Sequence, residues 1–235
     1  MDTIMIELSV SRPEDILVGA ISHLGYPGPE AVSDNILAQI DDGIDTCRKL
    51  ARPEAICRST AYTGLGKNAI RGERLCLETA NWTRLATRMS GIKELSCFAI
   101  TLGNAVDERI SRLGKSAMLQ ALMLDAAASV LADLCADQIQ QQVYIHYQRK
   151  GLKSSARFSP GYCDWPMQEG QRAIIPFLRP SSIGISVADS GLMTPRKSVS
   201  GAIIAAERML AESPCFLCAR DCRHRRAPYQ DRARP

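Results

Sequence analysis

The chain has 235 residues, of which 46% are hydrophobic and 23% charged, the ordinary composition of a globular protein with one sizeable domain. Its net charge of +4 is small and comes from the arginine-rich residues 220–235, so the remainder does not indicate a nucleic-acid-binding body. No uninterrupted apolar run reaches the roughly eighteen residues that a membrane-spanning helix needs. The N-terminus is acidic, unlike a secretory signal, and we therefore expect a cytoplasmic protein without a membrane partner.

The N-terminal residues predict two helices. Ser11, Pro13 and Glu14 indicate a helix start, because a serine cap, an early proline and a first-turn acidic residue are typical of helix N-termini. This helix is expected to end before Gly25, and a second helix to begin after Pro29. The apolar residues of the second helix recur at every fourth position, namely Val32, Ile36, Ile40 and Ile44. We interpret residues 1–54 as an N-terminal helical layer.

Strands and helices alternate through the middle of the chain, residues 55–212. The expected elements are a strand at 55–62, a short strand from 75, a short helix at 83–89, a strand at 95–103, a helix from about 105, a long helix at 116–147, a strand at 199–204 and a helical turn at 205–210. This alternation predicts an α+β fold, in which an antiparallel or mixed sheet is flanked by long helices. Residues 213–235 then form a basic tail that contains cysteines.

An acidic stripe runs along the predicted long helix. Asp125, Ser129, Asp133 and Asp137 are four residues apart in succession, which places them on one face. Like charges at this spacing repel each other. The stripe is either a solvated edge or a row of carboxylates beside a cationic ligand such as a sulfonium, whose charge centre donates no hydrogen bond and is stabilised by the field alone.

The loop after this helix contains a second candidate site. Pro160 and Gly161 predict a tight turn with the glycine at positive φ. The turn is expected to leave backbone groups near Ser159 and Tyr162 free to bind a ligand, and the planar guanidinium of Arg157 suits a bidentate contact with a carboxylate. The alternative interpretation is a plain turn that carries an aromatic residue.

Two segments carry a family resemblance. Arg-Phe-Ser-Pro-Gly-Tyr at 157–162 and Pro-Arg-Lys-Ser-Val-Ser-Gly at 195–201 resemble the S-adenosylmethionine-binding activation domain of cobalamin-dependent methionine synthase. A carboxylate of that family falls on Asp133, within Ala-Asp-Leu-Cys-Ala-Asp at 132–137, while Phe158, Cys163 and Gly151 depart from the family pattern. The resemblance implies that the ligand is bound by Asp133, Arg157, Ser159, Gly161, Tyr162, Ser198, Ser200 and Gly201, with Tyr162 at the reacting centre.

The resemblance also implies a function. The protein would bind S-adenosylmethionine and support the reductive methylation of cob(II)alamin, a reduction that irreversible methyl transfer draws forward. The cobalamin would be carried by a partner methyltransferase subunit, as in a split methionine synthase, because no cobalamin-binding or homocysteine-binding module is recognisable in the sequence. A flavodoxin-like or ferredoxin-like protein would supply the electron.

Nine cysteines are an unusual number for such a chain. Six are scattered singly and resemble small buried hydrophobic residues. Cys215, Cys218 and Cys222 form a cluster near His224 that supplies three soft ligands, whereas zinc and iron–sulfur clusters need four. The cluster is a zinc or iron–sulfur site, a set of redox-active thiols, or a set of inert reduced thiols.

Two other classes of function stay open at this stage. One is an electron-delivery protein for another corrinoid methyltransferase, with the cysteine cluster as its redox centre. The other is a non-enzymatic binding module whose basic tail docks RNA or an acidic partner.

Overall fold

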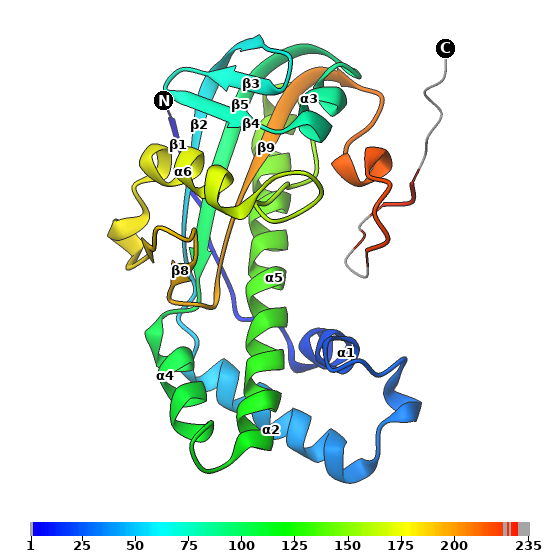
Figure 1. Cartoon of the computed structure of the whole chain (residues 1–235), viewed down its shortest axis with the longest axis vertical. Helices are drawn as coiled ribbons and strands as arrows, with labels where there is room; N and C mark the ends of the chain where they lie inside the picture. The colour runs from blue at the N-terminus through cyan, green and yellow to red at the C-terminus, as the bar shows by residue number, and fades with distance from the viewer. Residues whose placement is uncertain (1, 223–224, 226, 230–235) are drawn as a thin grey trace.

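The computed structural model describes residues 2–222, 225 and 227–229, which form a twisted antiparallel sheet covered by helices (Figure 1). The sheet has the order β4-β3-β2-β5-β9-β6, with β1 also paired to β2, and β7 and β8 form a separate pair. The strands are β1 (Asp2–Ile4), β2 (Glu54–Leu65), β3 (Ala69–Gly72), β4 (Leu75–Glu78), β5 (Met89–Thr101), β6 (Lys153–Ser154), β7 (Ser186–Val187), β8 (Met193–Thr194) and β9 (Ser198–Met209).

The helices lie on both faces of this sheet and at one end of it. They are α1 (Pro13–His23), α2 (Asp34–Leu50), α3 (Ala80–Ala86), α4 (Asn104–Leu113), α5 (Met118–Arg149) and α6 (Met167–Leu178), with short 3-10 turns at Pro29–Ala31, Pro180–Ile183 and Pro214–Leu217. Helix α5 runs along the length of the molecule, from α1, α2 and α4 at one end to the sheet at the other (Figure 1). The predicted α+β fold class is confirmed.

The two central strands are apolar on both faces. Residues 95–101 of β5 and 200–206 of β9 are all buried. Because side chains alternate across a strand, Phe98 and Ile100 face α5 while Cys97 and Ala99 face the opposite core, which contains Trp165 and α6. Burial on both faces explains why these strands read in the sequence as continuous hydrophobic runs.

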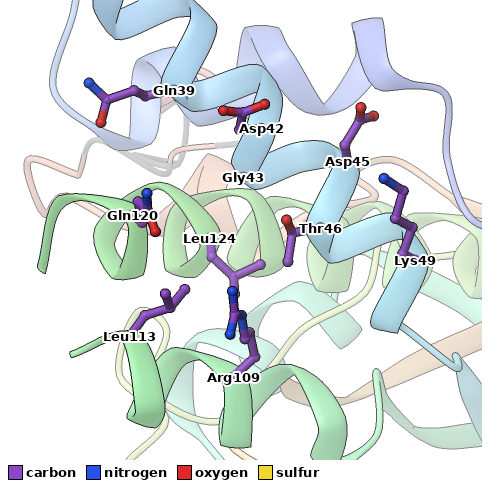
Figure 2. A pocket seen from close by; sticks show the side chains of 10 residues that line it. All are labelled: Gln39, Asp42, Gly43, Asp45, Thr46, Lys49, Arg109, Leu113, Gln120 and Leu124. Carbon is purple, nitrogen blue, oxygen red and sulfur yellow. The ribbon is translucent and has the colours of Figure 1, made fainter. Parts of the chain in front are cut away.

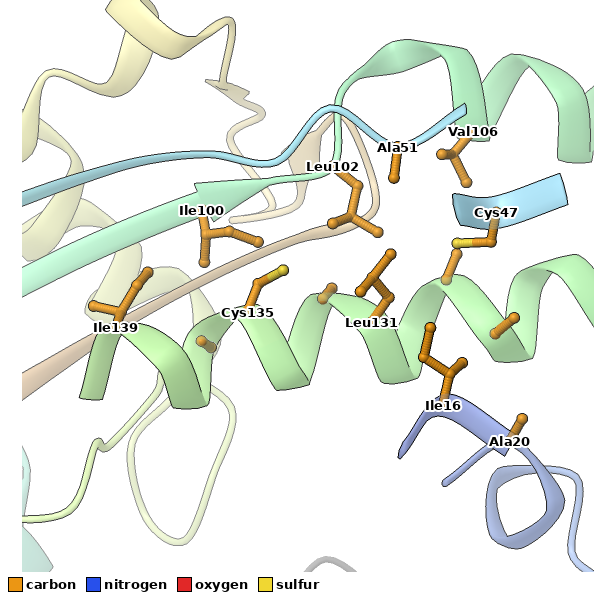
Figure 3. Close-up of a cluster of buried hydrophobic side chains, with 14 of the residues drawn as sticks. Ile16, Ala20, Cys47, Ala51, Ile100, Leu102, Val106, Leu131, Cys135 and Ile139 are labelled. Carbon is orange, nitrogen blue, oxygen red and sulfur yellow. The ribbon is translucent and has the colours of Figure 1, made fainter. Parts of the chain in front are cut away.

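Helix α5 is the centre of the larger core. Leu131, Cys135 and Ile139 lie between the helix and the sheet, and Ile16 and Ala20 of α1 pack on another side of it (Figure 3). By length and composition α5 would suffice to cross a membrane, a property that a search for uninterrupted apolar runs does not detect. Half of its most apolar window is buried in this structure, as in the core helix of a globular protein. The cytoplasmic location stays a prediction.

Several element predictions differ from the structure. The helical turn predicted at 205–210 is wrong, because β9 continues to Met209, where it pairs with Met89 of β5. The helix predicted at 83–89 begins three residues earlier, since Thr79 caps it by accepting a hydrogen bond from the backbone N–H of Trp82. Strands β1, β3, β6, β7 and β8 were not predicted, and β1 joins the sheet rather than the helical layer.

The N-terminal helices share one core with the rest of the chain. Buried residues of α1 and α2 belong to the same hydrophobic cluster as those of α5 and the central strands. This shared core extends across the predicted boundary at residue 54. The division of the chain at 54 and 212 into three parts stays a prediction.

Candidate functional site

Arg157 meets two carboxylates of the acidic stripe. Its Nε donates to Asp137 Oδ1 at 2.8 Å, and its Nη2 donates to Asp133 Oδ1 at 2.7 Å. The arginine side chain is 3% exposed, whereas those of Asp133 and Asp137 are 44% and 43% exposed. The backbone N–H of Arg157 also donates to Gln140 Oε1 at 2.6 Å, so α5 holds both ends of this residue.

The electrostatics keep this arginine charged. Burial lowers the pKa of Arg157, but the carboxylates of Asp137 and Asp133 raise it by more, so that the pKa lies above its usual value. A guanidinium in this position is a fixed positive charge beneath two half-exposed carboxylates. Arg157 therefore orients Asp133 and Asp137 rather than presenting its own charge at the surface.

A groove of about 1030 Å³ lies beside these carboxylates. We call it the α5 groove; its walls come from α1, α5, the turn after residue 159 and the start of β9. The lining includes Ser22, Tyr26, Asp133, Asp137, Tyr162, Arg196, Lys197 and Ser198. Three of the predicted ligand-binding residues, namely Asp133, Tyr162 and Ser198, thus share one cavity although they come from three separate segments.

The turn before Tyr162 has the predicted shape. Gly161 has φ of 93°, in the region that favours glycine. The backbone N–H of Tyr162 donates to the Ser159 carbonyl at 3.2 Å, and the Tyr162 carbonyl accepts from the N–H of Trp165 at 3.0 Å. The backbone groups that the sequence suggested would be free are thus used within the turn. The Ser159 hydroxyl is buried and has no hydrogen-bond partner among the described residues.

The second motif divides between the groove and the core. Ser198 lines the groove, and its hydroxyl donates to the Pro195 carbonyl at 2.7 Å. Ser200 is buried and donates to Gln171 Oε1 of α6 at 3.1 Å. A Cβ on Gly201 would lie 2.8 Å from the ring of Phe98, so a glycine is needed for this strand to pack. Ser200 and Gly201 are therefore placed to hold β9, not to line the groove.

The sequence prediction missed a second cation on the acidic stripe. Lys197 Nζ lies 2.8 Å from Asp125 Oδ1 and 2.8 Å from Ser129 Oγ, and it also donates to the Asp125 carbonyl at 3.1 Å. With Arg157 on Asp133 and Asp137, each aspartate of the stripe has a basic partner, so the stripe is not a plain solvated edge. The only feature of the sequence that could have pointed to this contact is the position of Lys197 inside the second motif.

A fourth cysteine, which the sequence did not indicate, lies beside the three clustered cysteines. Cys163 lines a pocket of about 390 Å³ together with Cys215, Cys218 and Cys222. Burial raises the pKa of the Cys163 thiol well above its usual range, and Cys218 raises it further. Arg225 supports this loop by donating to the carbonyls of Cys215 and Cys218 at 3.0 and 2.9 Å.

These thiols do not form a ready metal site. Within residues 2–222, 225 and 227–229, no three His, Cys, Asp or Glu side chains are grouped so that they could hold a metal ion. His224, the further candidate ligand, and most of the basic tail lie outside the described residues.

A third cavity, of about 300 Å³, lies between α2, α4 and α5 (Figure 2). Its lining includes charged side chains such as Asp42, Asp45, Lys49 and Arg109. None of the predicted site residues lines it, so the α5 groove is the cavity that joins the sequence motifs.

Comparisons with known proteins identify the family of this chain. The family model for the vitamin B12 dependent methionine synthase activation domain matches residues 78–232. The crystal structure of the MetH reactivation domain bound to AdoHcy is similar in fold, with a TM-score of 0.64 and 17% identity over 89% of this chain and 80% of that chain. No curated protein matches. Because the family model covers more than half of the chain, the protein belongs to the family of the vitamin B12-dependent methionine synthase activation domain.

Proposed function

We propose that the α5 groove binds S-adenosylmethionine and that the protein supports reductive methylation of a corrinoid on a partner methyltransferase subunit. The observation that carries this proposal is the carboxylate pair of Asp133 and Asp137, which Arg157 holds beside the same groove as Tyr162 and Ser198. The similar MetH reactivation domain is bound to AdoHcy, and the matched family is the activation domain of vitamin B12 dependent methionine synthase, which supports the same ligand class.

The charges of the groove suit a sulfonium. Asp133 and Asp137, which share the guanidinium of Arg157, line the groove with side chains that are 44% and 43% exposed. A half-exposed carboxylate attracts a sulfonium through space and accepts hydrogen bonds from the ammonium of the same ligand. Methyl transfer needs no general base, so the residues of the groove would act by position.

The acceptor of the methyl group is expected to come from a partner. Cobalamin on that partner would supply the nucleophilic cobalt, and the residues at the mouth of the groove would meet it. Tyr162, which is 37% exposed and lines the groove, is the residue that we expect nearest to the corrin. The electron donor would be a flavodoxin-like or ferredoxin-like protein, and the site residues predicted from the sequence stay predictions.

Calorimetry with S-adenosylmethionine and S-adenosylhomocysteine tests the proposal. The two ligands differ by one positive charge at sulfur, so the variant Asp133→Asn should lose more affinity for the methylated ligand. At an effective dielectric constant near 20 the expected difference is about tenfold, or about 1.4 kcal/mol. Asp41→Asn on the exposed face of α2 is the matched control and should bind both ligands as the parent does.

Two results would contradict this proposal. Absence of S-adenosylmethionine binding by the parent protein would remove the function itself. An equal loss of affinity for both ligands in Asp133→Asn would show that this carboxylate does not recognise the sulfonium.

The cysteine pocket bears on the predicted metal site. Cys163 is placed to be the fourth thiol that zinc or an iron–sulfur cluster would need beside Cys215, Cys218 and Cys222. Such binding would require the thiols to turn toward one another. The metal site therefore stays a prediction, which the metal content of protein purified without oxygen would test.

A further inference from the structure

The turn at Tyr162 lies between two cavities. Tyr162 lines both the α5 groove and the cysteine pocket, the cavity of about 390 Å³ that Cys163, Cys215, Cys218 and Cys222 also line. Cys163, the next residue of the chain, lines the cysteine pocket but not the groove. Two successive residues of the turn thus connect the proposed ligand site with a cluster of thiols.

The backbone of Cys163 is held in an uncommon conformation. Its φ of 51° lies in the left-handed region, which a residue other than glycine keeps only where the surrounding structure supports it. Asp164 supplies this support, because its carboxylate accepts hydrogen bonds from the hydroxyl of Thr79 and the N–H of Asn81, both at 2.9 Å. These contacts anchor the turn to the start of α3.

The opposite wall of the cysteine pocket is also held in place. The hydroxyl of Ser213 accepts from the N–H of Cys215 at 3.2 Å, and Arg225 donates to the carbonyls of Cys215 and Cys218 at 3.0 and 2.9 Å. The short turn at Pro214–Leu217 packs against α3 as well. Since α3 contacts both walls, two segments that are distant in the sequence meet in a defined arrangement.

The thiols of Cys163 and Cys218 meet in this arrangement. They are hydrogen-bonded to each other, and both cysteines are reduced in this structure. Burial raises the pKa of the Cys163 thiol, which makes it a weak nucleophile toward molecules in solution. Its reaction with the neighbouring thiol is intramolecular and therefore favoured by proximity. The pair is thus better placed to form a disulfide than to be modified singly.

We propose that Cys163 and Cys218 form a reversible disulfide that weakens ligand binding in the α5 groove. The oxidant is the disulfide of a small thiol, such as oxidised glutathione. One cysteine displaces the first half of the oxidant and forms a mixed disulfide, which the second cysteine resolves by displacing the other half. The two cysteine thiols lose two protons and two electrons, and the oxidant gains them as it becomes two thiols.

The new bond would act on the groove through Tyr162. A covalent S–S bond is shorter than the hydrogen-bonded contact that it replaces, so its formation draws the turn toward the loop at 213–222. Tyr162 then moves relative to the rest of the groove wall. This effect rests on the proposed function of the groove. Oxidising conditions also deplete the electron that cobalt reduction needs, so the disulfide would stop the use of S-adenosylmethionine when the corrinoid cannot be reduced.

Peptide mapping by mass spectrometry tests the bond in the parent chain. After incubation with oxidised glutathione the map should contain a Cys163–Cys218 linkage, and dithiothreitol should remove it. Cys163→Ser and Cys218→Ser should each abolish the linkage, whereas the matched control Cys76→Ser, on β4 outside the pocket, should leave it. Absence of the linkage in the parent, or a pairing among Cys215, Cys218 and Cys222 in its place, overturns the inference.

Calorimetry on the reduced and oxidised parent tests the effect on the groove. The oxidised form should bind S-adenosylmethionine about tenfold more weakly, because a displaced side chain misplaces its contacts, and dithiothreitol should restore the affinity. In Cys218→Ser the affinity should not respond to oxidised glutathione. Equal affinities of the two parent forms overturn the coupling of the bond to the groove. If the reduced parent does not bind S-adenosylmethionine, the proposed function fails and the coupling with it, while the peptide map still decides the disulfide.

Discussion

At the scale of single residues, the site depends on one buried cation. Arg157 joins the loop after β6 to two successive turns of α5 through Asp133 and Asp137. Without this cation the two carboxylates would repel each other at a spacing of four residues. The arginine therefore stabilises a pair of half-exposed acidic side chains at the edge of the α5 groove.

Replacement of Arg157 should affect both stability and binding. Arg157→Ala removes two charge-assisted hydrogen bonds, and because the aspartates are half exposed and regain water, the expected loss is about 1–3 kcal/mol of unfolding free energy. S-adenosylmethionine should bind more weakly as well, since Asp133 and Asp137 lose their orientation. Arg157→Lys, which keeps the charge but not the fork, should lie between the two.

Urea denaturation followed by circular dichroism measures the first effect, and calorimetry on the folded fraction measures the second. Parent-like stability together with parent-like affinity in Arg157→Ala would show that the aspartates need no positioning.

At the scale of the elements, α5 serves the fold and the site with different faces. Its apolar side chains pack against α1, α2 and the sheet. Its acidic stripe forms ion pairs with Arg157 and Lys197, which come from later segments of the chain. The last turn of the helix adds a titratable group. His146 Nε2 is buried and has no hydrogen-bond partner within the part of the chain that the structure describes, and its ring packs edge-on against Tyr147.

This histidine should make stability depend on pH. Burial lowers the pKa of His146 below its ordinary value of 6.5, and Lys150 lowers it further, against smaller opposite effects of Glu94 and Asp2. The unfolded chain therefore binds the proton more readily than the folded chain, so stability is fully present above pH 6.5 and is lost as the pH falls through the lowered pKa.

The variant His146→Gln should flatten the decline in unfolding free energy between pH 7 and pH 5, as chemical denaturation at each pH would show. Burial raises the pKa of Glu94, but the hydrogen bonds from Lys150, Ser59 and Tyr147 and the charge of Lys150 together lower it by more, so that carboxyl titrates below this window. A slope identical to that of the parent would rule out His146 as its source.

At the scale of the whole molecule, the α5 groove spans parts of the chain that are distant in sequence. Its lining combines α1, α5, the turn at Tyr162 and the start of β9. A ligand held there would link the N-terminal helices to the sheet, and it would stabilise the chain as a unit because it binds only the folded form.

Saturating S-adenosylmethionine should therefore raise the stability of the whole chain. At a free concentration of about 100 times the dissociation constant, the expected gain is about 2.7 kcal/mol. Thermal unfolding with and without the ligand measures it, and at the same ligand concentration Asp133→Asn should show a smaller shift. A transition that does not move in the parent protein would contradict ligand binding at the groove.

Prediction from the sequence succeeded where the signal was local. The apolar runs at 95–103 and 199–204 predicted the two central strands, and an uninterrupted stretch without proline or glycine predicted α5. It failed at residues 205–210, whose composition suits a helix but which pair with β5. Local propensity lost there to sheet pairing with a segment more than a hundred residues away.

The candidate site was likewise predicted where short motifs carry the signal and missed where separate segments pack together. The motifs pointed to Asp133, Arg157 and Tyr162, and the structure brings these three together around one groove and its supporting ion pairs. The burial of Arg157, the pairing of Lys197 with Asp125 and the arrival of Cys163 beside Cys218 were not predictable, because each depends on how separate segments pack.

The sequence by itself determined the α+β class, the long helix and the family resemblance, because hydrophobic periodicity and short motifs are written in contiguous residues. Only the tertiary structure decided which charges meet. Asp125 and Lys197 are 72 residues apart, and Asp133 and Arg157 are 24 apart, so their contacts follow from the packing of α5 against the sheet and its loops. That packing buries Arg157 beneath its aspartates and leaves Arg196 exposed at the groove, a difference between two arginines that no local pattern contains.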